Sequence, residues 1–144
     1  EWASSNGFYT AVVTLAYDVV VSSSLRGLPV NAIYAPRLRI NNGVVSGVDT
    51  SSFTRIEETP WCIGCGLCKR LVVKNLMNNL QVSRESVIAI GDGLPDACVF
   101  LETGYSIAIE PSKDLVARNA SRTINGDEDP LIIIKDYYYR LQLQ

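Results

Sequence analysis

A short acidic loop is the first place where this sequence could do chemistry. Residues 88–96 read IAIGDGLPD, an apolar segment that runs into a glycine-rich turn with Asp92, and Asp96 follows four residues later. Ligands of open α/β sheets bind beyond the carboxyl ends of the strands, which is where such a turn would place Asp92. Two carboxylates at this spacing can share a hard cation, preferably Mg²⁺. A turn residue at 92 and a helix cap at 96 would explain the same pattern.

Three cysteines form a second candidate site. Cys62, Cys65 and Cys68 stand in a CxxCxxC run that contains two glycines, and Cys98 lies much further along the chain. Close thiolates on such a loop can bind Zn²⁺ or an iron–sulfur (Fe–S) cluster. No fourth ligand is obvious, so a loop disulfide or free thiols are the alternative.

The composition excludes several kinds of site and partner. The 144 residues include no histidine, so this chain alone can form neither a Ser-His or Cys-His nucleophile nor a metal site with histidine ligands. A net charge of −2 argues against binding to nucleic acid. No apolar run is long enough to span a membrane, and no signal-peptide pattern opens the sequence. We therefore expect a cytoplasmic protein with neither nucleic acid nor membrane as its partner.

Strand-like and helix-like segments alternate along the chain. Apolar, β-rich runs predict strands, and apolar residues at helical spacing predict helices. The expected strands are 8–15, 32–34, 38–40, 44–45, 86–90, 104–109 and 121–124, and the expected helices are 17–25, 69–80, 96–102, 112–118 and 130–140, with 47–60 as a loop. Asn41-Asn42-Gly43 predicts a hairpin turn. The alternation indicates an α/β fold with a mainly parallel sheet, in a single domain over residues 1–144.

From residue 8 to about residue 140, the sequence resembles the haloacid dehalogenase-like (HAD) hydrolases, specifically their phosphoserine-phosphatase-like branch. GDGLPD at 91–96 is similar to the family's GDGxND motif, and AVVTLAYD at 11–18 is similar to its VVSGGFD motif. Residues 32–47 resemble the family's YAFANRL…DGKLTG stretch, and Lys69 stands in the place of its third-motif lysine. The resemblance implies a three-layer, Rossmann-like core.

The same resemblance implies a Mg²⁺-dependent phosphomonoester hydrolase that acts on a small phosphorylated metabolite. The hydroxyl of Thr14 and the nearby backbone at Leu15 would bind the phosphate, and Lys69 would bring a positive charge to it. Asp92 would hold Mg²⁺, and Asp96 would ligate or orient the ion. Thr14 and Lys69 are thus the expected catalytic residues, with Asp92 and Asp96 as the metal site.

Departures from the family pattern bear on the substrate. Leu15-Ala16 replaces two glycines and adds side chains where the backbone would approach the ligand. Pro95 replaces the asparagine of GDGxND and removes an amide side chain and an N–H. Cys68-Lys69 resembles a cysteine-rich stretch of phosphatases that act on phosphoethanolamine and phosphocholine, so these substrates stand beside phosphoserine as expectations.

The family's nucleophile is missing from these residues. No DxDx(T/V) motif, which carries the aspartate that forms an aspartyl-phosphate, occurs in the sequence. The resemblance therefore implies the C-terminal part of a phosphatase core, without the N-terminal strand and the cap domain, and it leaves open whether the chain alone is an enzyme. We expect a homodimer or a further N-terminal segment to complete the sheet. The alternatives are a non-catalytic binding protein and a cysteine-cluster module.

Overall fold

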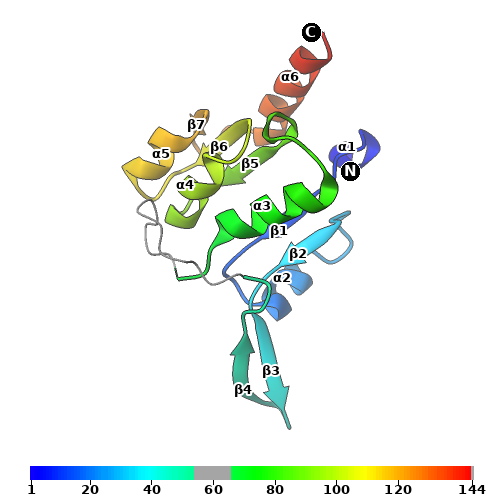
Figure 1. Ribbon diagram of the computed structural model, residues 1–144, viewed down its shortest axis with the longest axis vertical. Coiled ribbons are helices and arrows are strands. Elements are labelled where there is room, and N and C mark those ends of the chain that lie inside the picture. The colour runs from blue at the N-terminus through cyan, green and yellow to red at the C-terminus, as the bar shows by residue number, and fades with distance from the viewer. Residues whose placement is uncertain (54–65, 144) are drawn as a thin grey trace. The chain divides into compact units, whose positions relative to one another are not determined.

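The computed structural model describes residues 1–53 and 66–143 as a succession of helices and short strands (Figure 1). In chain order the elements are α1 (Trp2–Ser5), β1 (Ala11–Val13), α2 (Asp18–Ser24), β2 (Ala32–Tyr34), β3 (Arg37–Asn41), β4 (Val44–Asp49), α3 (Lys69–Leu80), a 3₁₀ turn (Arg84–Ser86), β5 (Ile88–Gly91), α4 (Leu94–Phe100), β6 (Tyr105–Ile109), α5 (Asp114–Asn119), β7 (Arg122–Ile124) and α6 (Pro130–Gln142). This alternation, with parallel strand pairs, confirms the predicted α/β class. The chain divides into two compact units, Glu1–Val73 and Lys74–Gln144. A single domain over 1–144 stays a prediction.

The first unit contains a parallel pair of strands and an antiparallel hairpin. β1 runs parallel to β2 with Val12 opposite Ile33, and β3 pairs with β4. Asn42 (φ 51°) and Gly43 (φ 78°) both have the positive φ that a tight hairpin turn requires, which confirms the predicted hairpin. β4 is longer than expected and continues to Asp49, so the expected loop over 47–60 is wrong for residues 47–49. Pairing of Arg37 with Asp49 extends the ladder past a bulge.

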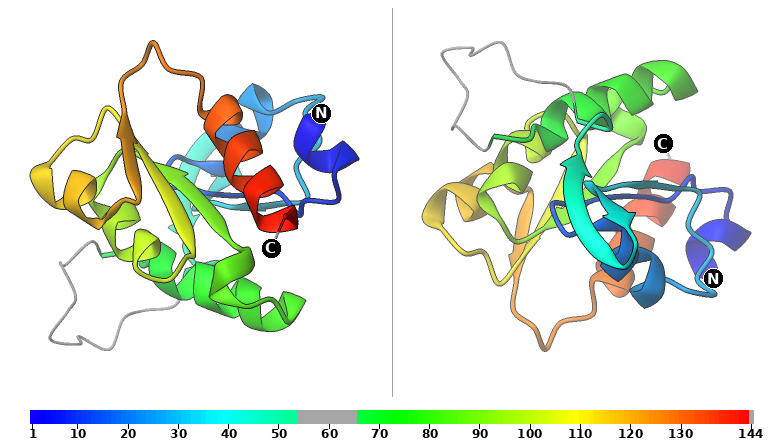
Figure 2. Two further views of the ribbon diagram at one scale, coloured as in Figure 1. Left: turned by 90° about the horizontal axis from the view of Figure 1, so that it is seen from above. Right: turned by 90° about the horizontal axis from the view of Figure 1, so that it is seen from below.

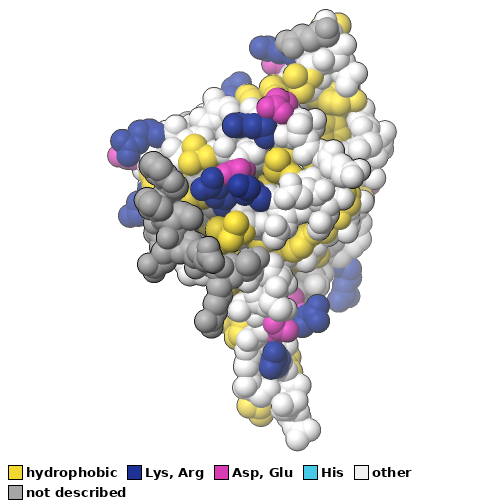
Figure 3. Space-filling model, viewed as in Figure 1, with side chains coloured by type: hydrophobic (Ala, Val, Ile, Leu, Met, Phe, Trp, Pro, Cys, Tyr) yellow, Lys and Arg dark blue, Asp and Glu magenta, His cyan; other side chains and the backbone are white. Residues whose placement is uncertain are grey.

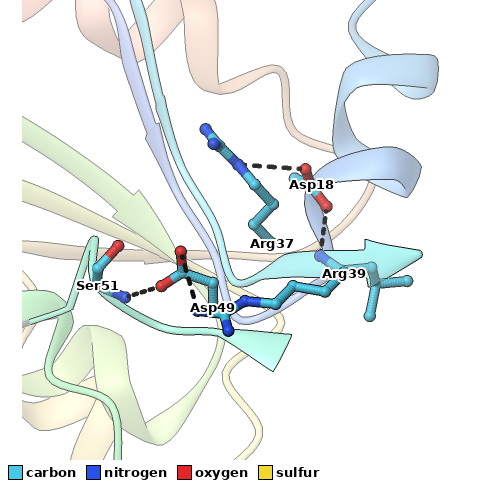
Figure 4. A network of polar contacts seen from close by, with 6 residues as sticks. Asp18, Arg37, Arg39, Asp49 and Ser51 are labelled. Atoms are coloured by element: carbon cyan, nitrogen blue, oxygen red, sulfur yellow. Dashed lines mark hydrogen bonds and ion pairs between the residues drawn. The ribbon is translucent and has the colours of Figure 1, made fainter. Parts of the chain in front are cut away.

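A polar network ties this hairpin to the start of α2 (Figure 4). The carboxylate of Asp18 accepts the Leu38 N–H at 3.0 Å and lies 3.8 Å from Arg37 Nε. At the end of β4, the Ser51 N–H donates to Asp49 Oδ1 at 2.9 Å. This hydrogen bond is the main cause that lowers the pKa of the Asp49 carboxyl. The hairpin is therefore anchored at its base by two carboxylates.

The second unit is a three-layer sandwich. Its sheet has the order β5-β6-β7, all parallel. Neighbouring residues of β6 face opposite sides: Ala108 packs with Ala97, Phe100 and Val116 of α4 and α5, whereas Ile107 packs with Ile124 and Ile133. Because Ile133 belongs to α6, that helix covers one face of the sheet and α4 and α5 cover the other (Figure 2). The buried core of this unit lies on both faces of β6.

Among the predicted boundaries that differ from the structure, two bear on the candidate site. The strand expected over 8–15 is confined to Ala11–Val13, and its residues are half-buried rather than fully covered on both faces. The helix expected from Asp96 begins at Leu94, because Gly93 is extended (φ −103°) and Pro95 occupies the first turn. Proline is favoured there, since that turn has no intrahelical acceptor for its N–H. This places Asp96 at the third helical position.

Apolar side chains remain at the surface of α6. Figure 3 shows hydrophobic side chains over this helix; Ile132 within it is 66% exposed, and Leu143, directly after it, is 87% exposed. Exposed apolar residues also occur on the β3–β4 hairpin, where Ile40, Val44 and Val45 are each more than half exposed. Within the described ranges, no helix has the length and apolar character needed to cross a lipid bilayer.

Candidate metal and phosphate site

Strand β5 carries Asp92 to the carboxyl end of the parallel sheet. β5 pairs with β6 from Ile88 opposite Tyr105 to Gly91 opposite Ala108, and Asp92 follows as the first residue beyond the strand. Its side chain is exposed, and its backbone carbonyl accepts the Ser112 N–H at 2.9 Å. The structure thus places Asp92 at the edge where ligands of open α/β sheets bind.

Asp96 lies beneath this loop and organises it. Its residue is only 7% exposed, and its Oδ2 atom accepts the N–H groups of Gly93 at 3.0 Å and Asp92 at 3.2 Å. The fit is close, because a Cβ at Gly91 would lie 2.6 Å from the same oxygen. Accepting from the N-cap backbone is the part that the acidic residue plays in a capping box. Asp96 therefore orients the Asp92 loop, and its role as a metal ligand stays a prediction.

A hollow opens beside Asp92. It has a volume of about 360 Å³ and is lined by Gly91, Asp92, Ile109 and Glu110. Glu110 directly follows β6, as Asp92 follows β5, so two acidic residues lie at the same edge of the sheet and line the hollow. Sequence reasoning missed Glu110, although a charged residue directly after a buried parallel strand was a visible signal.

The donor atoms at this edge suit Mg²⁺. The Asp92 carboxylate is exposed at the hollow and supplies oxygen ligands, while Asp96 holds the loop that carries it. In the residues that the structure describes, no group of three or more His, Cys, Asp or Glu side chains could hold a metal ion. Mg²⁺ is commonly bound through one or two carboxylates and keeps several waters, so a single protein carboxylate with room for water fits it.

The predicted phosphate-binding residues of the first unit lie just beyond β1. Thr14 is half-buried, and its N–H donates to the Tyr34 carbonyl at 2.9 Å. Its hydroxyl oxygen accepts the Ala16 N–H at 3.1 Å, which leaves the hydroxyl proton available to a ligand. Leu15 is 38% exposed at this turn. The Thr14 turn is therefore formed in the structure, and its binding of phosphate stays a prediction.

Lys69 is the first residue of α3, and Cys68 immediately precedes it as a half-buried free thiol. Cys62 and Cys65 lie outside the described residues, so the predicted Zn²⁺, Fe–S or disulfide site at Cys62, Cys65 and Cys68 stays a prediction. Thr14, Leu15 and Lys69 belong to the first unit, and Asp92 and Asp96 belong to the second. The structure brings Asp92 and Asp96 together, and the convergence of the remaining residues on Asp92 stays a prediction.

Comparisons with known proteins bear on the family. The sequence model described as haloacid dehalogenase-like hydrolase matches residues 62–130. An uncharacterized hydrolase of Schizosaccharomyces pombe is 37% identical over 59 residues, which cover 40% of this chain and 19% of that protein. The chain thus spans about a fifth of the length of this curated relative.

Solved structures bear on the fold. A phosphoserine phosphatase structure with a phospho-aspartyl intermediate analogue superposes with a TM-score of 0.72 at 21% identity, covering 93% of this chain and 58% of that one. A HAD family hydrolase from Salmonella enterica serovar Typhi gives a TM-score of 0.67 at 18% identity, covering 85% of this chain and 39% of that one. The match over residues 62–130 and these shared folds confirm the resemblance of this chain to the haloacid dehalogenase-like hydrolases.

Proposed function

We propose that this chain forms the core of a Mg²⁺-dependent phosphomonoester hydrolase that acts on a small phosphorylated metabolite. One observation carries the proposal. The Asp92 carboxylate stands exposed at the carboxyl end of β5, beside an open hollow, on a loop that buried Asp96 holds by two N–H groups. The family match over residues 62–130 includes this loop. Phosphoserine, phosphoethanolamine and phosphocholine are the substrates that we propose to test first.

Each residue has a physical role in this proposal. Catalysis of phosphoryl transfer depends on positioning and on stabilising negative charge. Asp92 would hold Mg²⁺, which when bound supplies positive charge to the phosphoryl oxygens. The Thr14 hydroxyl would donate a hydrogen bond to the phosphate, and the Lys69 ammonium would add a second positive charge. The backbone near Leu15 would line the same phosphate position.

The aspartate nucleophile of the family mechanism would have to come from outside the 144 residues. We propose that it arrives on a strand of a further segment, which pairs with the free edge of β5 and belongs either to the same polypeptide or to a second copy of the protein. Among the described strands, β5 is an edge of its sheet, and Ile90 is 45% exposed there. An unpaired strand edge with an exposed isoleucine favours the addition of another strand.

Hydrolysis of the three phosphomonoesters by the protein as its gene encodes it tests the proposal. We expect turnover that requires Mg²⁺ and that falls by a factor of about 100 or more in Asp92→Asn, which removes the carboxylate that would hold the metal, and in Lys69→Ala, which removes a positive charge from the transition state. Lys74→Ala is the matched control for Lys69→Ala, because Lys74 lies on the same helix and pairs with Glu102 at 3.8 Å. Its kcat should stay within about twofold.

Two results would contradict the proposal. Turnover that is indifferent to Mg²⁺ and to Asp92→Asn would show that the metal role is wrong. Phosphate binding without hydrolysis of any phosphomonoester would favour a non-catalytic protein built on the same core.

The proposed cytoplasmic location calls for a separate measurement, by fractionation of cells that express the protein.

A further inference from the structure

We propose that Glu110 is a positioning residue for Asp92. It acts through residues 110–112, which we call the strap, because they connect the loops that follow β5, β6 and β7. This inference rests on the proposed function, since it concerns how Asp92 is presented to a metal ion. It adds a residue that neither the sequence motifs nor the expected ligand set includes.

A backbone hydrogen bond at each end of the strap joins it to the carboxyl edge of the sheet. At one end, the Glu110 N–H donates to the Ile124 carbonyl at 3.0 Å, at the end of β7. At the other end, the Ser112 N–H donates to the Asp92 carbonyl at 2.9 Å. Two hydrogen bonds therefore hold the backbone of Asp92: its N–H donates to Asp96 Oδ2, and its carbonyl accepts the Ser112 N–H.

The side chain of Glu110 makes a third hydrogen bond that holds the strap. Its Oε1 atom accepts the Gly126 N–H at 3.2 Å, in the loop that follows β7. The two groups are close, since a Cβ at Gly126 would lie 2.6 Å from Oε1. This hydrogen bond connects the strap to a loop 16 residues further along the chain. Removing it leaves Glu110 joined to the β7 side by its backbone alone.

The backbone conformation of Glu110 explains why the strap needs the hydrogen bond to Gly126. Glu110 has φ 42°, in the left-handed region that residues other than glycine rarely adopt. The strained conformation turns the chain between β6 and Ser112, and it persists only where surrounding contacts impose it. Without the Gly126 contact, we expect the strap to relax, and the Ser112–Asp92 hydrogen bond would be lost with it.

Two substitutions separate reach from charge at this position. Glu110→Asp keeps the negative charge but shortens the side chain by one methylene, so the carboxylate no longer reaches the Gly126 N–H. Glu110→Gln removes the charge but keeps a carbonyl oxygen at the same distance. A positioning role predicts that Glu110→Asp is damaging and that Glu110→Gln is tolerated, whereas a direct charge role predicts the reverse.

The measurement is the binding of Mn²⁺ as a probe for the Mg²⁺ site, followed by the electron paramagnetic resonance signal of free Mn²⁺. It uses the protein as its gene encodes it and requires no turnover. We expect Glu110→Asp to weaken binding by about 10-fold, the lower end of the range for the loss of a direct partner of a metal ligand, because Glu110 acts on Asp92 through Ser112. Glu110→Gln should bind within about threefold of the unsubstituted protein.

Glu128→Ala is the matched control. Glu128 is an exposed carboxylate in the same loop region; it accepts the Asn125 N–H at 3.3 Å and pairs with Arg122 at 3.1 Å. Its hydrogen bond to Asn125 and its ion pair with Arg122 involve neither the strap nor Asp92, so Mn²⁺ affinity should not change. Circular dichroism of each variant checks that the fold is retained.

Each outcome decides one of the two proposals. Equal affinity in Glu110→Asp and the unsubstituted protein, or a loss in Glu110→Gln as large as in Glu110→Asp, would overturn the positioning role and leave the metal site standing. Absence of Mn²⁺ binding in the unsubstituted protein would overturn the metal site itself, and the positioning role with it.

Discussion

Asp96 holds the backbone of Asp92. From a position that is 7% exposed, its Oδ2 atom accepts the Asp92 N–H at 3.2 Å and also the Gly93 N–H at 3.0 Å. The two acidic residues of the GDGLPD loop therefore differ in environment: Asp92 is exposed beside the hollow and Asp96 is buried under the loop. The chemistry that we propose depends on this division, because a fixed loop gives the Asp92 carboxylate a fixed position.

Substitution of Asp96 should show this support as a loss of stability. Asp96→Ala leaves the N–H groups of Asp92 and Gly93 without their acceptor, which we expect to lower the free energy of unfolding by about 1–3 kcal/mol. Asp96→Asn keeps a carbonyl oxygen in place and should lose less. Urea unfolding of the two variants measures the difference, and an equal loss in both would argue against the role of this oxygen.

Gly104 should not tolerate a side chain. A Cβ at this position would lie 2.6 Å from Glu85 Cα and 2.8 Å from the Arg84 carbonyl oxygen, both of which are backbone atoms. Since the backbone cannot give way as a side chain would, Gly104→Ala should lower stability by about 1–3 kcal/mol. Gly47→Ala is the control, because a Cβ there meets nothing within 4 Å. If thermal unfolding showed a larger loss of stability in Gly47→Ala than in Gly104→Ala, this packing would be contradicted.

Replacing Gln81, the residue after α3, with glycine should make the protein more stable. Gln81 has φ 54°, and the N–H groups of Gln81 and Val82 donate to the carbonyls of Asn78 and Met77 at 3.2 and 3.1 Å. This is the Schellman pattern, in which the left-handed residue is usually glycine. Gln81→Gly should raise the free energy of unfolding by about 1 kcal/mol. Gln81→Ala should give no such gain in the same denaturant titration, and a gain of equal size would refute the explanation.

The base of the hairpin should be sensitive to acid. The hydrogen bond from the Ser51 N–H, followed by that from the Ser51 side chain, lowers the pKa of Asp49 below its usual value of 3.8. A carboxyl whose pKa is lower in the folded state stabilises that state above its unfolded pKa, and this contribution is lost as the pH falls through the folded value. We expect an NMR titration midpoint for Asp49 below 3.8.

Two substitutions of Ser51 assign the cause of this shift. Ser51→Pro removes both the N–H donor and the hydroxyl, so the pKa of Asp49 should move back toward 3.8, and Ser51→Ala, which removes only the hydroxyl, should give less than half of that change. If Ser51→Ala alone gave more than half of the change seen in Ser51→Pro, the order of the two causes would be reversed.

Much of the architecture could be predicted from local sequence, because short-range pattern decides it. Asn42-Gly43 provides the two positive φ angles of the hairpin, and the buried Ile107 and Ala108 reflect the apolar run that predicted a strand over 104–109. Boundaries were harder to predict. Whether β4 continues to Asp49 depends on its pairing with Arg37, which is 12 residues away and has no local signal.

Part of the candidate site could also be predicted, because the local sequence pattern places one of its residues. Asp92 follows a recognisable apolar strand, so its place at the sheet edge could be inferred from the order of residues alone. The buried position of Asp96 depends on the missing side chain of Gly91 and on the helix that begins at Leu94. The place of Glu110 at the same edge could have been inferred from the strand before it, but its positive φ and its hydrogen bond to Gly126 could not, because they arise only when three strands lie side by side.

The central claim is that Thr14 and Lys69 meet Asp92 around one phosphoryl group, and a crystal structure of the protein with Mg²⁺ and a phosphate analogue tests it most directly. We predict that the Asp92 carboxylate contacts the metal and that the Thr14 hydroxyl and the Lys69 ammonium both lie within hydrogen-bond distance of the analogue. A structure in which Thr14 or Lys69 lies on a different face of the molecule from the bound metal would contradict the account.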